Sequence, residues 1–277
     1  MPGRFAGKVA IITGSSFGIG RETDLLFAKE GAKVTVTGRS EERLQGTKKA
    51  LTDAGIPESN FLIVAADITT SSGQDSLISR TLEKFGKINI LVNNAGAAVP
   101  DAGKQSGVNQ GIETFEKNIK LNVQSVIEMT QKIRPHLAKT KGDIVNISSV
   151  AALNFGWAQS PYYPLAKAAL DQYTRSAAID LIGEGIRVNT VNPGRVKTGF
   201  FEAATGLSSD ASEKFYDDNT NGIPIGFCGR PDHISKAIAF LADRDSSEYI
   251  IGQNIVVDGG TSLVLGIHNQ FPKPAAK

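Results

Sequence analysis

The sequence lacks the residues on which several kinds of site depend. It has one cysteine, Cys228, and three histidines in 277 residues. A single cysteine cannot form a disulfide within the chain, and without a Cys/His cluster a zinc site is not expected. The histidines lie late in one predicted helix, at the start of another and in the tail, so a Ser-His-Asp triad is not expected either.

A large charge of one sign and long apolar runs are missing too. The net charge is +2, and no basic stripe interleaved with aromatic residues gives reason to expect nucleic acid as a partner. No apolar run reaches the roughly 18 residues of a membrane-spanning helix, and no charged leader precedes an apolar core. These absences favour a cytoplasmic protein that does not bind a membrane.

Short apolar runs rich in β-branched residues alternate with helical patterns along the whole chain. The helical patterns lie near residues 18–30, 41–55, 72–85, 112–138, 161–183 and 231–242. The predicted strands are 8–13, 33–37, 61–66, 88–93, 143–148, 187–191 and 254–257. This alternation predicts a doubly wound α/β (Rossmann) domain, with ligands bound at the carboxyl ends of the strands. No linker or repeat divides the chain, so we expect residues 1–277 to form a single domain.

A glycine-rich segment, Thr13–Gly20 (TGSSFGIG), joins the first predicted strand to the first helix. Its glycines permit positive φ angles and a close approach of the backbone to a ligand. The N–H groups and the dipole at a helix N-terminus favour phosphate. We therefore expect a phosphate site formed by Gly14, Ser15, Ser16, Phe17, Gly18, Ile19 and Gly20. The alternative is a tight strand–helix turn without a ligand.

The end of the second strand bears on the choice of cofactor. An acidic residue there would bind the ribose 2′-hydroxyl of NAD, whereas an arginine accommodates the 2′-phosphate of NADP. The chain has Gly38 at the acid's place, followed by Arg39 and Ser40. This pattern favours NADP(H) over NAD(H), with Ser40 and Ser15 as helpers of the guanidinium. The alternative is a solvated arginine.

Tyr163 and Lys167 lie four residues apart where a helix is expected to begin. Residues at this spacing share one helix face, and a neighbouring cation lowers the pKa of a phenol. Such a phenol can exchange a proton with a carbonyl or alcohol oxygen. Pro164 biases Tyr163 toward an extended conformation, which would place the phenol at the entrance of the helix. Alone, the pair is more typical of a solvated helix face.

Together with Asn93–Gly96 (NNAG) and Pro193-Gly194, these motifs resemble the classical short-chain dehydrogenase/reductase family over about residues 5–260. The chain is most similar to the NADP-dependent carbonyl or ketone reductases of that family, including tropinone-reductase-like members. The resemblance implies a seven-stranded parallel sheet of order 3-2-1-4-5-6-7 and a homodimer or homotetramer. It also implies hydride transfer between NADP(H) and a carbonyl or alcohol.

The resemblance further implies a role for each matching residue. Tyr163 would be the general acid or base, Lys167 would lower its pKa and bind the nicotinamide ribose, and Ser149 would polarise the carbonyl. Asn122 would hold a water of a proton relay. Besides the glycine-rich segment, Tyr163 and Lys167, the cofactor-binding residues would be Arg39, Ser40, Asp67, Ile68, Asn94, Ala95, Gly96, Pro193, Gly194, Val196 and Thr198.

The spacing of serine and tyrosine departs from the family pattern. The family places the serine thirteen residues before the tyrosine, but Ser149 lies fourteen before Tyr163 and Val150 holds the thirteenth place. Tyr162 would restore the spacing, yet it is five residues from Lys167 and would face away from it. We therefore expect Tyr163 to be the acid, with one residue inserted in the loop 150–161. Ser149 is preferred to Ser148, which would face the other side of the strand.

The substrate is the least determined part of the site. Residues 198–227 occupy the family's variable substrate loop, and residues 99–111 form a long polar segment expected at the rim of the site. The apolar and aromatic residues of the substrate loop and the segment before it are Phe155, Trp157, Phe200, Phe201, Leu207, Phe215, Tyr216, Ile223 and Phe227. They indicate an apolar or cyclic ketone or aldehyde, unless they only pack the loop onto the body. In the tail 263–277, Phe271 is a candidate to cover a neighbouring subunit's cleft.

The leading hypothesis is a reductase. The alternative is an NADP(H)-binding redox-sensing or interaction module with little turnover.

Overall fold

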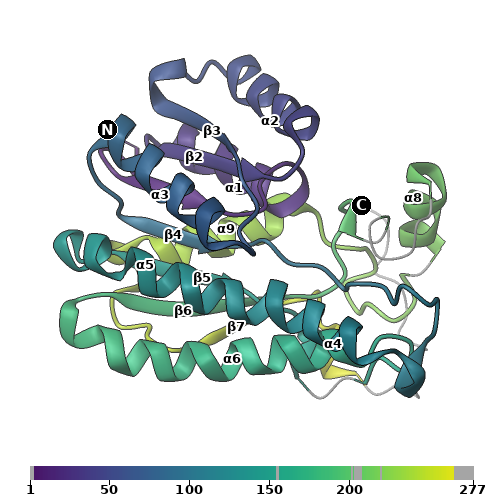
Figure 1. Cartoon of the computed structure of the whole chain (residues 1–277). Helices are drawn as coiled ribbons and strands as arrows, with labels where there is room; N and C mark the ends of the chain where they lie inside the picture. Colours follow the sequence, from purple (N-terminus) through teal and green to yellow (C-terminus); the bar gives the residue numbers. More distant parts are fainter. Residues whose placement is uncertain (1–2, 154–155, 201, 203–207, 219, 265–277) are drawn as a thin grey trace.

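The computed structural model describes residues 3–153, 156–200, 202, 208–218 and 220–264. Seven parallel strands form one sheet in the order β3-β2-β1-β4-β5-β6-β7, as the family resemblance implied (Figure 1). The strands are β1 (Val9–Ile12), β2 (Lys33–Gly38), β3 (Phe61–Ala65), β4 (Ile90–Asn93), β5 (Asp143–Ile147), β6 (Arg187–Pro193) and β7 (Asn254–Val257). The order reverses between β1 and β4, which places the topological switch point beside the glycine-rich segment.

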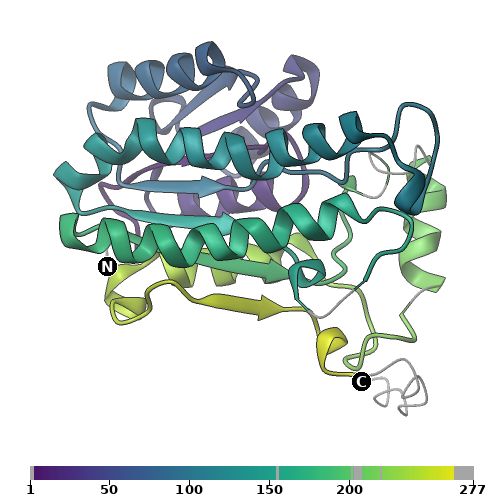
Figure 2. The same ribbon diagram turned by 60° about the horizontal axis from the view of Figure 1, so that its bottom comes forward.

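Helices cover both faces of the sheet. On one face lie α1 (Gly18–Lys29), α2 (Glu41–Asp53) and α9 (Pro231–Ala242). On the other lie α3 (Ser71–Phe85), α5 (Ser125–Thr140) and α6 (Tyr162–Leu181). Figure 2 shows α5 and α6 side by side along the sheet. The remaining helices are α4 (Ile112–Ile119), α8 (Ser209–Asp218) and the short α10 (Arg244–Ser247). No described helix has the length and apolar character needed to cross a lipid bilayer.

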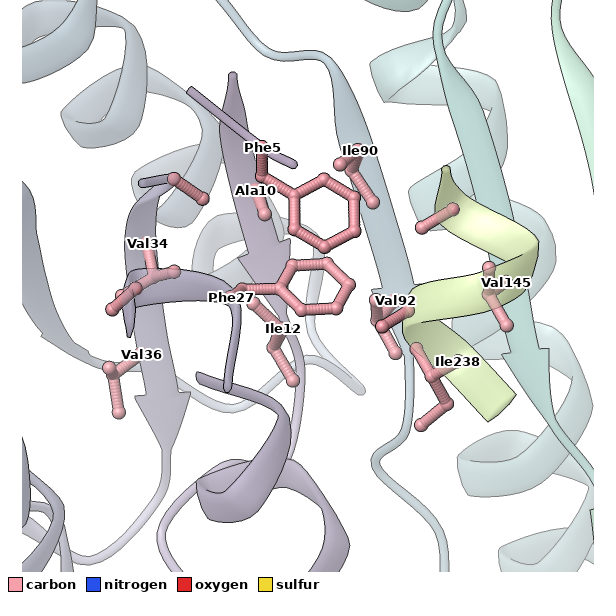
Figure 3. Close-up of a cluster of buried hydrophobic side chains, with 14 of the residues drawn as sticks. Phe5, Ala10, Ile12, Phe27, Val34, Val36, Ile90, Val92, Val145 and Ile238 are labelled. Atoms are coloured by element: carbon pink, nitrogen blue, oxygen red, sulfur yellow. The ribbon is translucent and has the colours of Figure 1, made fainter. Parts of the chain in front are cut away.

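Two apolar cores result from the alternation of side chains along each strand. Ala10 and Ile12 of β1 enter the core under α1 and α9, whereas Ile11 enters the core under α3, α5 and α6. Figure 3 shows the first core, where the rings of Phe5 and Phe27 stack with centroids 4.4 Å apart. Both phenylalanines are almost fully buried. The segment before β1 is thereby fixed to the helix that follows the glycine-rich segment.

The predicted helix over 112–138 is interrupted by a π-helical turn. Between α4 and α5 lies η3 (Lys120–Gln124), which has π-helical hydrogen bonding. π-Helical turns are rare and occur often at functional sites. Asn122, in the middle of the turn, is completely buried. Nothing in the hydrophobic period of this segment indicated the turn.

A buried ion pair joins β5 to β6 at their amino ends, opposite the ligand-binding edge. The two first residues of these strands, Asp143 and Arg187, are register partners, and Nε of Arg187 donates to Oδ1 of Asp143 at 2.8 Å. The guanidinium also donates to the Leu241 carbonyl at 2.9 Å and to Oγ of Ser247 at 3.0 Å. Arg244 donates to the same Asp143 oxygen at 3.1 Å. One carboxylate therefore links the sheet to the segment after α9.

Replacing Asp143 by alanine would leave Arg187 buried without its carboxylate. Removal of one partner of a buried ion pair costs about 3–5 kcal/mol, and we expect a loss of this size in the free energy of unfolding, measured by urea denaturation. Asp75→Ala is the matched control, because its partner Lys132, 2.6 Å away, belongs to an exposed pair. Equal losses in both variants would contradict a structural role specific to Asp143.

Candidate active site

A cavity of about 1240 Å³ opens along the carboxyl ends of the strands. Its wall comes from the segments that follow β1 to β6 and from the region after Thr198. It is lined by these predicted site residues: Gly14, Ser16, Phe17, Gly18, Ile19, Arg39, Ser40, Asp67, Ile68, Asn94, Ala95, Gly96, Ser149, Tyr163, Lys167, Pro193, Gly194, Val196 and Thr198. Ser15, Gly20 and Asn122 do not line it.

The glycine-rich segment is built for close contact with its surroundings. Gly14 and Gly18 have φ angles of 66° and 59°, which side chains other than hydrogen rarely permit. A Cβ at Gly14 would stand 2.7 Å from Cα of Ala95. The Asn94 side chain ties the two loops together, because its Nδ2 donates to the carbonyls of Thr13 and Gly14 at 2.8 and 3.0 Å. The cavity therefore meets bare backbone and the N-terminus of α1, a cradle that fits the phosphates of a dinucleotide.

Ser15 and Gly20 serve packing instead. The Ser15 hydroxyl donates to the Ile12 carbonyl at 2.9 Å and accepts from the Thr37 amide at 3.1 Å. It is fully buried, so the expectation that Ser15 helps to hold a 2′-phosphate is wrong. Ser16 lines the cavity in its place. Gly20 lets α1 approach Asn94, whose Nδ2 would be 2.6 Å from an added Cβ.

The end of β2 and the start of α2 present two arginines to the cavity. Arg39 follows Gly38, where a Cβ would lie 3.2 Å from Cβ of Ser16. Ser40 caps α2 by accepting from the Arg43 amide at 3.3 Å. The Arg43 guanidinium lies 5.5 Å from the ring centroid of Phe17 and lines the same cavity. Sequence reasoning missed Arg43, although its place in the first turn of the helix predicted to start at residue 41 was a usable signal.

Asp67 stands at the end of β3 near Arg39. Burial alone would raise the pKa of its carboxyl, but two hydrogen bonds from Thr69 and the charges of Arg39 and Lys120 lower it overall. An ionised Asp67 therefore faces this end of the cavity.

Tyr163 lies inside α6, which begins at Tyr162. The expectation that Pro164 holds Tyr163 in an extended conformation is wrong, because a proline in the first helical turn needs no N–H partner. The i, i+4 relation therefore holds, and Nζ of Lys167 lies 5.7 Å from the centroid of the Tyr163 ring. Nζ donates to the Ile147 carbonyl at 2.8 Å. The Lys167 side chain thus links α6 to the end of β5.

The neighbouring tyrosine and serine have other hydrogen-bond partners, although Ser148 also lines the cavity. The Tyr162 hydroxyl donates to the Gln110 carbonyl at 3.0 Å, and the residue does not line the cavity. The Ser148 hydroxyl donates to the backbone carbonyl of Lys167 at 3.2 Å. Ser149 lies in the cavity wall and forms a hydrogen bond with Tyr163. The geometry therefore favours the pair Ser149 and Tyr163.

Burial moves the pKa values of Tyr163 and Lys167 in opposite directions. It raises the pKa of Tyr163 to about 12, against a smaller lowering by the hydrogen bond with Ser149. It lowers the pKa of Lys167 to about 8, against the charge of Asp171. The expectation that Lys167 lowers the pKa of Tyr163 is not met here. Desolvation disfavours the phenolate more strongly than the neighbouring groups stabilise it.

Asn122 lies behind the cavity wall. Its Nδ2 donates to the carbonyls of Ala97 and Asn118 at 2.9 and 3.0 Å, and its Oδ1 accepts from the Ala97 amide at 3.2 Å. A Cβ at Gly96 would be 2.8 Å from this Oδ1 and 3.0 Å from Nζ of Lys167. The side chain therefore holds the loop after β4 beside the lysine.

Aromatic side chains form the far end of the cavity. Trp157 and Phe200 flank Tyr163, with ring centroids 6.0 and 5.5 Å from its own. Phe215, Tyr216 and Ile223 also line the wall, whereas Phe227 packs on His233. Phe155, Phe201, Leu207 and Phe271 lie outside the described residues. Sequence reasoning did not name Leu153, Arg195, Val256 or Leu263 among the lining residues.

The predicted rim does not reach the cavity. No residue of 99–111 lines it. Asp101 instead folds this segment on itself by accepting from the Gly111 amide at 2.9 Å and from Oγ1 of Thr114 at 2.7 Å. Among the described residues, no three His, Cys, Asp or Glu side chains gather in a way that could hold a metal.

Comparison with known proteins agrees with this geometry. A family model described as enoyl-(acyl carrier protein) reductase matches residues 14–262. The meso-2,3-butanediol dehydrogenase of Serratia marcescens is 33% identical over 259 residues, which cover 94% of this chain and 96% of that protein. A short-chain dehydrogenase/reductase of unknown function from Caenorhabditis elegans, crystallised with cofactor, has a TM-score of 0.94 and 55% identity over 96% of this chain and 99% of its own. Glucose dehydrogenase of the same organism, in the apo form, has a TM-score of 0.77 and 52% identity over 94% and 100%.

The pKa of Tyr163 can be tested by ultraviolet titration of its phenolate. We expect the difference between the wild type and Tyr163→Phe to show no phenolate near pH ~10, where an ordinary tyrosine is half ionised. The reason is burial, which raises the pKa to about 12. A difference signal that titrates well below pH ~10 would show instead that Lys167 dominates, as the sequence alone suggested.

Proposed function

This chain belongs to the classical short-chain dehydrogenase/reductase family, and we propose on that premise that it reduces a ketone or aldehyde of apolar or cyclic character with NADPH. The observation that carries the proposal is the meeting of Ser149, Tyr163 and Lys167 at one wall of the cavity. The glycine cradle lies in the same cavity. A proton donor and a nucleotide site are thereby placed side by side.

Different parts of the wall would hold different parts of the cofactor, which when bound supplies or accepts the hydride. The glycine-rich segment and the N-terminus of α1 would hold the pyrophosphate. Asp67 and Ile68 would contact the adenine. The nicotinamide end would lie between the loop after β4, which carries Asn94, Ala95 and Gly96, and the end of β6 with the segment that follows it, which carry Pro193, Gly194, Val196 and Thr198.

Three side chains would manage the proton. Tyr163 would donate its phenolic proton to the substrate oxygen, since a pKa of about 12 keeps the phenol protonated at neutral pH. The Ser149 hydroxyl would donate a hydrogen bond to the same oxygen and stabilise its developing negative charge. The Lys167 ammonium would add positive charge beside them and bind the nicotinamide ribose. Asn122 would act indirectly, by holding the loop after β4 and a relay water.

NADP(H) is preferred to NAD(H) in this proposal because of the end of β2. Gly38 leaves no carboxylate for a ribose 2′-hydroxyl, and Arg39, Ser40 and Arg43 form a cationic edge of the cavity. Guanidinium groups bind phosphate through paired, charge-assisted hydrogen bonds. A 2′-phosphate would satisfy both arginines.

The aromatic end of the cavity supports an apolar or cyclic substrate. The rings of Trp157 and Phe200 pack beside Tyr163, and Phe215 lines the same cavity. Apolar walls with a few polar groups are typical of small-molecule sites. We further propose that the chain forms a homodimer or homotetramer, which exposed Ile112, Leu165 and Ile179 on α4 and α6 support.

The first test is NADPH oxidation with a panel of diketones, quinones, cyclic ketones and steroids. We expect turnover with at least one member and a loss of roughly 10²- to 10⁴-fold in kcat for Tyr163→Phe, the usual contribution of a general acid. Tyr162→Phe is the matched control and should keep its activity, because this hydroxyl bonds to Gln110 outside the cavity. Tight NADPH binding without turnover on any member would favour a binding module.

The second test addresses the cofactor. Arg39→Gln removes one cation from the edge of the cavity, and we expect the KM for NADPH to rise by roughly tenfold or more while that for NADH changes little. Arg80→Gln, on an exposed face of α3, makes the same change of charge away from the cavity. Equal losses with the two cofactors in Arg39→Gln would remove the argument for NADP(H).

A further inference from the structure

A row of buried polar side chains lies behind the part of the cavity wall that carries Tyr163. Tyr163, Lys167 and Asp171 follow each other at four-residue spacing on one face of α6. Asn192, on the neighbouring strand β6, donates through Nδ2 to Oδ2 of Asp171 at 2.8 Å. The same Nδ2 donates to the backbone carbonyl of Ser149 at 3.0 Å. Asp171 and Asn192 are 3% and 0% exposed.

We propose that Asp171 and Asn192 are positioning residues of this site: the carboxylate of Asp171 orients the Asn192 amide, and that amide fixes the Ser149 backbone so that the serine hydroxyl faces Tyr163. This inference rests on the proposed reductase function, because it assigns a role in the same site.

The orientation of the amide follows from its two neighbours. An amide nitrogen carries two donors, and here both face oxygen acceptors, Oδ2 of Asp171 and the Ser149 carbonyl. A flipped amide would turn Oδ1 toward the carboxylate and lose both hydrogen bonds. Oδ1 of Asn192 has no hydrogen-bond partner in the described structure, so the two bonds of Nδ2 alone fix the orientation of the amide. The carboxylate of Asp171 therefore selects this orientation.

Ser149 needs such an anchor because it stands at the start of a loop. Its carbonyl accepts from the Ala152 amide at 3.0 Å and its hydroxyl accepts from the Ala151 amide at 3.1 Å, both within the same short turn. The contact with Asn192 is the bond that ties this turn to the sheet through a side chain. A serine displaced by as little as about 1 Å could lose a large part of its effect.

Asp171 also acts on Lys167 through its charge. Burial lowers the pKa of Lys167 to about 8, and the charge of Asp171 is what opposes this shift. Burial likewise raises the pKa of Asp171, against Ser148, Asn192, Arg175 and Lys167. The other ionisable groups on elements packed against α6 are Arg187 of β6, Asp143 of β5, Glu113, Glu116 and Lys117 of α4, Lys120 of η3, Glu128, Lys132, Arg134, His136 and Lys139 of α5, and Glu184 of η5 (Ile182–Glu184). None of them contributes to the shift at Lys167.

Kinetics separate positioning from general stability. We expect Asn192→Ala and Asp171→Ala to lower kcat by roughly 10- to 100-fold. In Asn192→Ala the NADPH dissociation constant should stay within about threefold of wild type, since Ser149 does not hold the nucleotide. In Asp171→Asn the new amide oxygen can still accept a hydrogen bond from Asn192, so this variant should keep most of its kcat well below the Lys167 pKa of about 8. As the pH is raised, its kcat should fall at a lower pH than that of the wild type, because Lys167 has lost the charge that holds its pKa up. Asp180→Asn, on the exposed face of α6, is the matched control for charge.

A second measurement does not depend on turnover. In protein labelled with ¹³C-lysine, the Lys167 signal, identified by its loss in Lys167→Arg, should titrate about half a unit or more lower in Asp171→Asn than in wild type and Asp180→Asn. Thermal unfolding shows which variants are folded. If an alanine variant does not fold, Asn192→Ser takes the place of Asn192→Ala, and Asp171→Asn takes the place of Asp171→Ala.

Each outcome decides a separate question. Unchanged kcat in the folded Asp171 and Asn192 variants would overturn the positioning role, and an unchanged Lys167 titration would overturn the effect of charge. If the wild type reduces no carbonyl compound, the proposed function fails while the titration still shows whether Asp171 sets the charge of Lys167.

Discussion

An ammonium group buried beside the nucleotide site constrains the surrounding structure. Lys167 is 3% exposed, and a buried cation is costly unless oxygen atoms face it. The Ile147 carbonyl accepts from Nζ at 2.8 Å, and the charge of Asp171 acts in the same sense. Gly96 leaves room for Nζ, because a Cβ there would be 3.0 Å away. The loop after β4, the end of β5 and α6 therefore meet around one charge, and each needs a particular residue there.

The same burial sets the protonation of the neighbouring phenol. Both groups shift toward their neutral forms, Tyr163 to a pKa of about 12 and Lys167 to about 8. In the proposed reaction this arrangement suits proton donation, because the phenol keeps its proton at neutral pH while most of the lysine is still charged. Alcohol oxidation needs the opposite state of Tyr163. The wall that buries Tyr163 thus also keeps its phenol protonated at neutral pH.

The parts of the fold that could be predicted depend on patterns local in the sequence. The strands and helices follow from hydrophobic period, and Lys167 favours Tyr163 over Tyr162 because helix geometry fixes which residues share a face. The π-helical turn at Asn122 has no comparable signature, since it changes hydrogen-bond partners rather than residue types. Which of Ser15 and Ser16 faces the cavity depends on Thr37, a contact across strands. The pKa of Tyr163 depends on burial, which spacing does not report.

The extra residue between Ser149 and Tyr163 has a structural explanation in the sheet. β5 and β6 pair in register up to Ile147 and Val191, and the Ser148 amide continues the ladder by donating to the Val191 carbonyl at 2.9 Å. Ser149 is the next residue, and Asn192 of β6 holds its carbonyl. The position of Ser149 is thus set by β6, while that of Tyr163 is set by the packing of α6 on the sheet. The spacing of fourteen residues therefore reflects the positions of two separate elements, β6 and α6, and not the length of the loop alone.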